Sequence, residues 1–219
     1  MTATMSPMPT APTPDPAGVR PPASARPSTE LDHLVDAGPI ARLLAPLALP
    51  MLPWLSLGLS AAAALGTMAA AGADRRATTA LGLVVVVLLA VPAMGRPPAG
   101  RFGWLMPGVV RGLEYGLVVR VVAAVDRPAM PIAFGLLCAV GYHHYDTVYR
   151  WRHTRRGPAG WVYRFGMGWD GRLILLAAIV LCTARLRAPL AIAAVLLAVV
   201  FVAESAIGWR AWLAAQRRG

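Results

Sequence analysis

Six long apolar runs dominate this 219-residue chain and limit what it can fold into. A helix that spans a bilayer needs about 20 mostly apolar residues. About a quarter of the residues of a soluble domain are charged, whereas this chain is 57% hydrophobic and 14% charged. The pattern predicts an all-α integral membrane bundle of about six transmembrane helices. The predicted spans cover 50–71, 77–94, 104–125, 129–147, 171–186 and 188–209.

The rest of the sequence divides the chain into three regions. Residues 1–30 contain eight prolines and little apolar surface that could be buried, which predicts a disordered tail rich in Pro and Ala. Residues 31–49 predict a short amphipathic segment that leads into a transmembrane domain at 50–215. Three polar residues of this short segment are expected to be solvated and to carry no chemistry: Asp32, His33 and Asp36.

The basic residues predict the orientation of the bundle. All 21 are Arg, and most lie in short loops between the apolar runs. If the amino terminus is inside, the inner segments hold 14 Arg and the outer turns hold five. The positive-inside rule then predicts a multi-pass protein of the bacterial inner (plasma) membrane with both termini cytoplasmic. This placement also argues against nucleic acid as a partner, despite a net charge of +11.

The cysteines give no sign of a metal or disulfide site. Cys138 and Cys182 lie inside apolar runs, and neither has another potential metal ligand at a suitable spacing. We therefore expect two buried free thiols that pack like small hydrophobic residues.

Charged residues inside the third span need an explanation. Glu114 lies near the midplane, where a charge costs roughly 2.5–3.5 kcal/mol, and Arg111 precedes it by one helical turn, with Tyr115 on the same face. Two interpretations stay open: a structural Arg111–Glu114 ion pair, or a pocket in which Arg111 binds an anionic group that Glu114 orients. Three glycines at four-residue spacing predict close approach of a neighbouring helix: Gly108, Gly112 and Gly116.

The fourth span ends in a dense polar segment. Helical spacing places His143, Asp146 and Arg150 on one face, and Asp146 can pair with Arg150 four residues later. His144 is expected to point away from this face, toward Arg152. One interpretation is a phosphate or lipid head group bound by the arginines, and the other is an ordinary interfacial anchor. A divalent metal is a weaker alternative because only two ligand types stand at this spacing.

The third and fourth spans are expected to pack as antiparallel neighbours joined by the short turn at 126–128. With a rise of 1.5 Å per residue, Arg111 and His143 lie at a similar depth, roughly 20–25 Å from this turn. We expect them to share one inward-opening cavity that binds an anionic ligand. The candidate ligand-binding residues are Arg111, Glu114, Tyr115, His143, His144, Asp146, Arg150 and Arg152; no catalytic residue, metal or cofactor is predicted.

Three short motifs resemble an uncharacterised bacterial family of polytopic membrane proteins: RGLEYG at 111–116, HHYDTVYR at 143–150 and GWDGR at 168–172. Members of that family often form the carboxy-terminal module of larger chains that carry nucleotidyltransferase and CDP-alcohol phosphotransferase domains. The similarity covers roughly residues 30–215. It implies a role in phospholipid or inositol-lipid head-group synthesis, with membrane lipids and a CDP-alcohol phosphotransferase or another lipid-synthesis enzyme as partners.

Three classes of function stay open. The first is an accessory or binding module with an inward-facing anionic-ligand site. The second is a membrane enzyme that acts on a phosphorylated lipid or polyprenyl carrier through Glu114, His143, His144 and Asp146, and the third is a small transporter or flippase. The chain lacks the series of aspartates that binds metal in CDP-alcohol phosphotransferases, because Asp170 stands alone. Asp170 is instead expected to cap the amino end of the fifth span.

Overall fold

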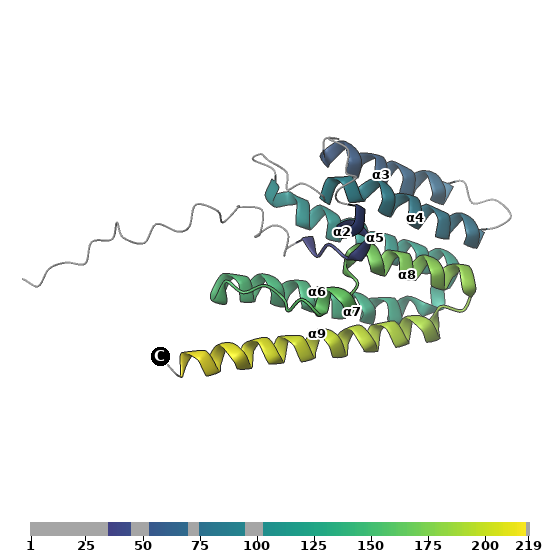
Figure 1. Cartoon of the computed structure of the whole chain (residues 1–219). Helices are drawn as coiled ribbons and strands as arrows, with labels where there is room; N and C mark the ends of the chain where they lie inside the picture. Colours follow the sequence, from purple (N-terminus) through teal and green to yellow (C-terminus); the bar gives the residue numbers. More distant parts are fainter. Residues whose placement is uncertain (1–34, 45–52, 70–74, 95–102, 218–219) are drawn as a thin grey trace, which may run out of the picture.

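The computed structural model describes residues 35–44, 53–69, 75–94 and 103–217, which form an all-helical bundle without strands in these ranges (Figure 1). The tail predicted at 1–30 lies outside the described residues. The main helices are α2 (Pro39–Leu44), α3 (Pro53–Ala69), α4 (Arg75–Met94), α5 (Met106–Val125), α6 (Met130–Thr154), α7 (Val162–Phe165), α8 (Gly168–Cys182) and α9 (Arg187–Gln216), with 3₁₀ turns at Gly103–Leu105 and Arg127–Ala129.

Each of the six predicted apolar runs forms one long helix, although three of the carboxyl ends differ clearly from the prediction. The fourth run was expected to end at 147, whereas α6 continues to Thr154 because its polar residues there pack against α9. The fifth run was expected to end at 186, whereas α8 ends at Cys182 and Thr183 is extended. The sixth run was expected to end at 209, whereas α9 continues to Gln216. Prolines occupy the first turns of α5 and α6, where the missing N–H leaves no hydrogen bond unmade.

The helices pack side by side, and the connections between them define two ends of the bundle. α3 packs on α4, α4 on α8, and α6 on α9, while α5 contacts both α6 and α8 (Figure 1). α5 begins near the end of the bundle where α6 and α9 finish, whereas α2, α7 and the start of α8 lie partway along the bundle (Figure 1). We call the end at which α6 and α9 finish the α2–α7 end. The opposite end, which carries the α5–α6 and α8–α9 connections, is called the hairpin end.

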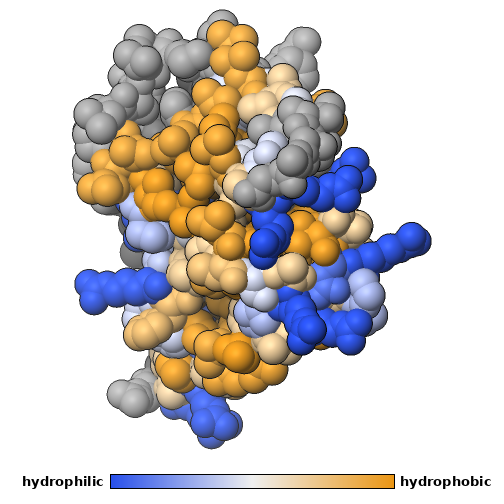
Figure 2. All heavy atoms as spheres, turned by 90° about the vertical axis from the view of Figure 1, so that its right-hand side faces the viewer, coloured by the Kyte–Doolittle hydropathy of each residue, from blue (hydrophilic) through white to orange (hydrophobic). Residues whose placement is uncertain are grey.

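Large apolar side chains cover much of the outer surface, whereas many polar side chains are buried. On α9, for example, five large apolar side chains are each more than half exposed: Ile192, Val195, Leu196, Val199 and Val202. Figure 2 looks onto the hairpin end, where hydrophilic side chains stand out from a largely hydrophobic surface. Most of the described arginines are exposed, whereas five of the six described acidic residues are buried.

Among the described residues, two helical segments are long and apolar enough to cross a membrane: Val162–Cys182 and Arg187–Gln216. The first combines α7 with α8, and the second is α9. A shorter apolar stretch lies within α3, at Leu55–Gly66.

Two expectations about packing are wrong. Cys138 and Cys182 are exposed rather than buried, because each lies on the outer face of its helix. No neighbouring helix in the described part of the chain packs closely against the three glycines of α5, because a Cβ built at each of them would meet nothing within 4 Å. These glycines are Gly108, Gly112 and Gly116. α5 packs through the opposite face, which carries Val110, Glu114, Leu117, Val118 and Val121. Two of the glycines instead line an open groove of about 360 Å³ between α3 and α5.

Candidate functional site

A buried ionic cluster lies partway along the bundle, where α2 and the start of α8 meet the middle of α5 and α6, and we call it the Asp36 cluster. Its members come from four separate segments of the chain and are at most partly exposed. They are Asp36 from the segment before α2, Glu114 and Tyr115 of α5, His143 and His144 of α6, and Arg172 of α8.

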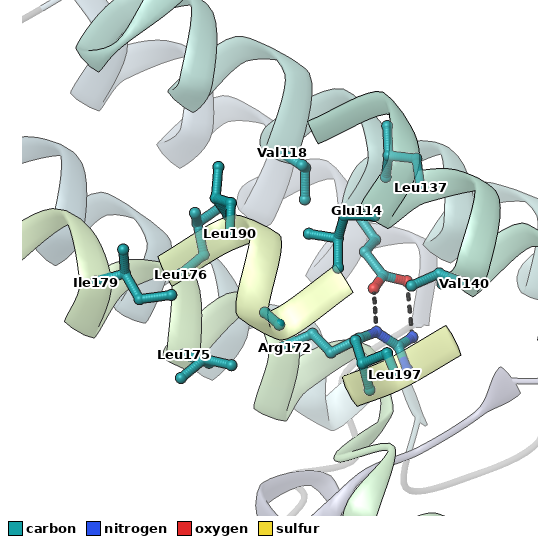
Figure 3. A pocket seen from close by; sticks show the side chains of 12 residues that line it. Glu114, Val118, Leu137, Val140, Arg172, Leu175, Leu176, Ile179, Leu190 and Leu197 are labelled. Atoms are coloured by element: carbon teal, nitrogen blue, oxygen red, sulfur yellow. Dashed lines mark hydrogen bonds and ion pairs between the residues drawn. The ribbon is translucent and has the colours of Figure 1, made fainter. Parts of the chain in front are cut away.

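Arg172 is the centre of the Asp36 cluster. Its Nε donates to Glu114 Oε1 at 2.6 Å, and its second terminal nitrogen donates to Glu114 Oε2 at 3.1 Å and to Asp36 Oδ2 at 2.9 Å. The remaining terminal nitrogen donates to the carbonyl of Gly166 at 3.1 Å. Figure 3 shows the two-pronged pairing of Arg172 with Glu114. All three nitrogens of this buried guanidinium therefore donate to protein oxygens, and three of the four acceptor oxygens belong to carboxylates.

The predicted partner of Glu114 was Arg111, and the structure assigns this role to Arg172. Both oxygens of Glu114 accept hydrogen bonds from Arg172, which was counted only among the arginines of an inner segment. Arg111 is half-buried, and its charge interacts electrostatically with Asp36 and Glu114. Arg172 therefore pairs with both oxygens of Glu114, and Arg111 adds a second positive charge beside this pair.

Asp36 was expected to be solvated, and this expectation is wrong. The residue is 5% exposed and lies 3.8 Å from His143 Nε2 and 3.3 Å from His144 Nε2, in addition to its contact with Arg172. Its backbone is left-handed, with φ of 55°. Burial alone would raise the pKa of this carboxyl group, but the Arg172 charge and the two imidazoles outweigh it and hold the pKa well below the usual value. Asp36 is therefore an ionised internal residue.

A hydrogen-bonded chain leads from Asp36 to the partly exposed Tyr115. His144 Nε2 faces Asp36, and His144 Nδ1 lies 2.8 Å from the Tyr115 hydroxyl. Because an ionised carboxylate only accepts hydrogen bonds, a neutral His144 carries its proton on Nε2, so Nδ1 accepts from Tyr115. This arrangement corrects the expectation that His144 points away. α6 is covered by α5 on one face and by α9 on another, which buries both His143 and His144.

The expected proximity of the third and fourth spans is confirmed, with a different residue pair in contact. α5 and α6 are neighbours, and the side chains that join them are Tyr115 and His144. His143 is 2% exposed and stacks on Phe201 of α9, with ring centroids 4.1 Å apart. The His143 side chain therefore faces α9 and Asp36, and it does not lie on the outer surface.

A second buried cluster surrounds Arg150 on the side of α6 that faces α9. The predicted pairing of Asp146 with Arg150 is confirmed at 2.9 Å. Arg150 also forms two parallel hydrogen bonds, of 2.7 and 2.6 Å, with the carboxylate of Glu204. Trp209 donates to Asp146 at 3.0 Å, and the Ala159 amide donates to Glu204 at 3.2 Å. Two carboxylates thus neutralise Arg150, which is poorly placed to bind a phosphate. Arg152, in contrast, is exposed.

Asp170 caps a helix, but a different one from the helix that the sequence predicts. Its carboxylate accepts from the backbone amides of Gly38 at 2.6 Å, Ile40 at 2.9 Å and Ala41 at 2.9 Å. These amides lie at the start of α2, so Asp170 fixes α2 onto α8. The contact is tight: a Cβ at Gly38 would stand 2.0 Å from the Met167 carbonyl oxygen.

A narrow, mostly apolar cavity lies beside the Glu114–Arg172 pair, between α5, α6, α8 and α9 (Figure 3). Its free volume is about 20 Å³, which is room for about one water molecule. Apolar side chains such as Val118, Leu176 and Leu197 form most of its wall. Within the described ranges, no three His, Cys, Asp or Glu side chains are arranged to hold a metal ion.

Charge is distributed unevenly between the interior and the surface. Of the six acidic residues in the described part of the chain, five are buried and Asp126 is half-buried. Thirteen arginines are exposed, so every fully exposed charge there is positive. These arginines are Arg42, Arg75, Arg76, Arg120, Arg127, Arg152, Arg155, Arg156, Arg164, Arg185, Arg187, Arg210 and Arg217.

Comparison with known proteins places the chain in one family and finds no characterised relative. No curated protein matches it, and no solved structure matches it. A model of a family of unknown function, DUF5941, matches residues 25–218, which include every residue of both buried clusters. The chain is therefore a member of the DUF5941 family.

Proposed function

We propose that this chain is a multi-pass membrane module that binds anionic, phosphate-bearing lipid head groups at its α2–α7 end. The observation that carries the proposal is the exclusively positive exposed charge of the described residues, beside an apolar outer surface. Anionic lipids attract arginines that stand near the membrane surface. A guanidinium also forms two parallel hydrogen bonds with phosphate oxygens.

The α2–α7 end is the better candidate of the two ends because arginines and aromatic rings occur there together. Arg152, Arg156 and Arg164 are exposed in this region. The Tyr149 ring packs against the His153 ring at a tilt, with ring centroids 4.2 Å apart, and it also contacts Trp209. Aromatic and basic side chains at helix ends are typical of the membrane–water interface.

The proposed topology has six membrane-spanning helices, α3, α4, α5, α6, α8 and α9, with both termini in the cytoplasm of a bacterial cell. Charged groups buried between helices and apolar groups outside support it. In a chain without its two cysteines, Arg76→Cys and Arg156→Cys place one thiol at each end. A membrane-impermeant maleimide added to intact cells should label the first thiol and not the second. Equal labelling of both would contradict the topology.

The proposed biological role is accessory: the module holds anionic lipid for an enzyme of phospholipid or inositol-lipid head-group synthesis. A CDP-alcohol phosphotransferase or another enzyme of that process is the proposed partner. This role follows from the proposed ligand chemistry and from the motif resemblance, and the binding experiment below tests its first requirement.

The binding test compares the two ends of the bundle. Purified protein in an uncharged detergent is titrated with phosphatidylglycerol or phosphatidylcholine while its thermal unfolding midpoint is measured, since ligand binding stabilises the folded state. Phosphatidylglycerol should raise the midpoint of the wild type, and the rise should be lost in Arg152→Gln/Arg156→Gln/Arg164→Gln.

The matched control removes the same number of charges at the hairpin end, as Arg127→Gln/Arg185→Gln/Arg187→Gln. This variant should respond to phosphatidylglycerol like the wild type. An equal loss of response in both triple variants would contradict a site at the α2–α7 end, and an equal response to both lipids would contradict selection of the anionic one.

A second candidate function is an enzyme that acts on a phosphorylated lipid or polyprenyl carrier. The hydrogen-bonded chain Tyr115–His144–Asp36 favours it, because a hydroxyl linked to an imidazole and a carboxylate suits proton transfer. The test measures phosphate release from phosphatidic acid and from a polyprenyl diphosphate. Release by the wild type that Tyr115→Phe abolishes, with unchanged unfolding, is the expected result. No release from either compound by the wild type would argue against this function.

A further inference from the structure

The Asp36 carboxylate lies between the side chains of Arg172, His143 and His144, and we call the site that these three side chains form the cradle. Arg172 Nη2 at 2.9 Å, His144 Nε2 at 3.3 Å and His143 Nε2 at 3.8 Å converge on its two oxygens. Arg111 adds a positive charge that interacts with Asp36. Nitrogen donors from two helices around two oxygens form a site that suits any carboxylate or phosphate oxygen pair.

The cradle does not depend on Asp36 for its construction. Arg172 is also held by Glu114 and by the Gly166 carbonyl, and His143 is stacked on Phe201. These contacts remain when the Asp36 carboxylate is withdrawn. An external anion that entered the cradle would therefore meet donors that are already oriented.

The residues that follow Asp36 are held to α8 at a point away from the cradle. α2, which follows it, is fixed by three amide hydrogen bonds to Asp170. Asp36 itself takes a left-handed backbone conformation with φ of 55°, which is uncommon for a residue other than glycine, although less so for Asp than for most. The Asp36 carbonyl also accepts a hydrogen bond from the Trp169 amide at 3.2 Å. The Asp36 carboxylate can therefore leave the cradle by rotation of its side chain, while the Asp36 backbone and α2 stay in place.

We propose that Asp36 is an internal competitor in an anion-binding site, and that the carboxylate or phosphate group of a ligand displaces it from Arg172, His143 and His144. This inference rests on the proposed function, since it gives the anionic head group a specific inner site. It also assigns a regulatory role to the segment before α2: while Asp36 is seated, the inner site is closed.

The experiment measures phosphate binding by the full chain in an uncharged detergent, using isothermal titration with inorganic phosphate and with glycerol phosphate. Asp36→Gly removes the carboxylate and accepts the left-handed backbone without strain. It should bind either compound at least tenfold more tightly than the wild type. Adding Arg172→Gln to Asp36→Gly should abolish the gain.

The outcomes separate this inference from the proposed function. If folded Asp36→Gly binds inorganic phosphate, glycerol phosphate and phosphatidylglycerol no better than the wild type, the inference is overturned, whatever the surface arginines do. If Asp36→Gly does not fold, Asp36→Asn takes its place, because it removes the charge and keeps the volume; no gain with that variant overturns the inference equally.

Two further arms identify the source of the anion. A gain with phosphatidylglycerol that is absent with inorganic phosphate assigns the site to a lipid head group, and the reverse assigns it to a free phosphate compound. The triple variant Arg152→Gln/Arg156→Gln/Arg164→Gln, combined with Asp36→Gly, should keep the gain for inorganic phosphate. Loss of that gain would place the new binding on the surface and overturn the assignment to the inner site.

Discussion

The coupling between Glu114 and Arg172 allows a quantitative test of the buried cluster. Arg172→Gln strands two buried carboxylates, Glu114 and Asp36, and removal of one partner of a buried ion pair costs about 3–5 kcal/mol. Glu114→Gln leaves Arg172 paired with Asp36 and retains one acceptor oxygen, so its expected cost is about 1–3 kcal/mol. Arg172→Gln should therefore be the more destabilising single change.

The double variant distinguishes a direct pair from two independent effects. Once Arg172 is absent, Glu114→Gln removes a stranded charge, so the double variant should be no less stable than Arg172→Gln alone. The combined loss should therefore fall below the sum of the two single losses by at least the loss of Glu114→Gln, which is about 1–3 kcal/mol. Equilibrium unfolding in mixed micelles with increasing dodecyl sulfate, followed by circular dichroism, measures all three free energies.

The control for this cycle is Arg185→Gln, which changes an exposed arginine and should shift the free energy of unfolding by no more than about 0.5 kcal/mol. Additive losses in the double variant would refute the direct pairing of Glu114 with Arg172. A larger loss for Glu114→Gln than for Arg172→Gln would refute the central position of Arg172.

Three further predictions concern the segment around α2. The low pKa of Asp36 means that its stabilising effect is complete above about pH 5 and is lost as the pH falls through the folded-state value, so Asp36→Asn should flatten the acid limb of a plot of unfolding midpoint against pH. Asp170→Asn weakens three hydrogen bonds that hold α2 and should speed tryptic cleavage after Arg42 relative to the wild type. Gly38→Ala should lower the unfolding midpoint, because its Cβ would overlap the Met167 carbonyl, whereas Gly116→Ala should raise it, since alanine favours a helix by about 1 kcal/mol over glycine.

Local patterns predicted the parts of this molecule that depend on local geometry. Apolar runs located the six long helices, and helical spacing identified the Asp146–Arg150 pair. The short turn between the third and fourth spans predicted that α5 and α6 are neighbours. Each of these features depends on residues close in sequence or on the shortest available connection.

The partners of the buried charges could not be predicted in the same way, because they are distant in sequence. Asp36 and Arg172 are separated by 136 positions, Glu114 and Arg172 by 58, and Arg150 and Glu204 by 54. One signal was present: Glu204 stands inside an apolar run and requires a partner for the same energetic reason as Glu114. That reasoning points to the need for a partner and leaves its identity to the tertiary structure.

The segregation of charge connects orientation with ligand binding. Buried Arg150 and Arg172 neutralise carboxylates, so they do not contribute to the positive-inside bias even though they fall in segments counted as inside. Exposed arginines of the α2–α7 end, such as Arg152, Arg156 and Arg164, remain. The negative charge of the cytoplasmic leaflet attracts juxtamembrane arginines. The side chains that orient the bundle in our proposal are thus the same ones that bind anionic head groups, and removal of their charge should weaken both effects together.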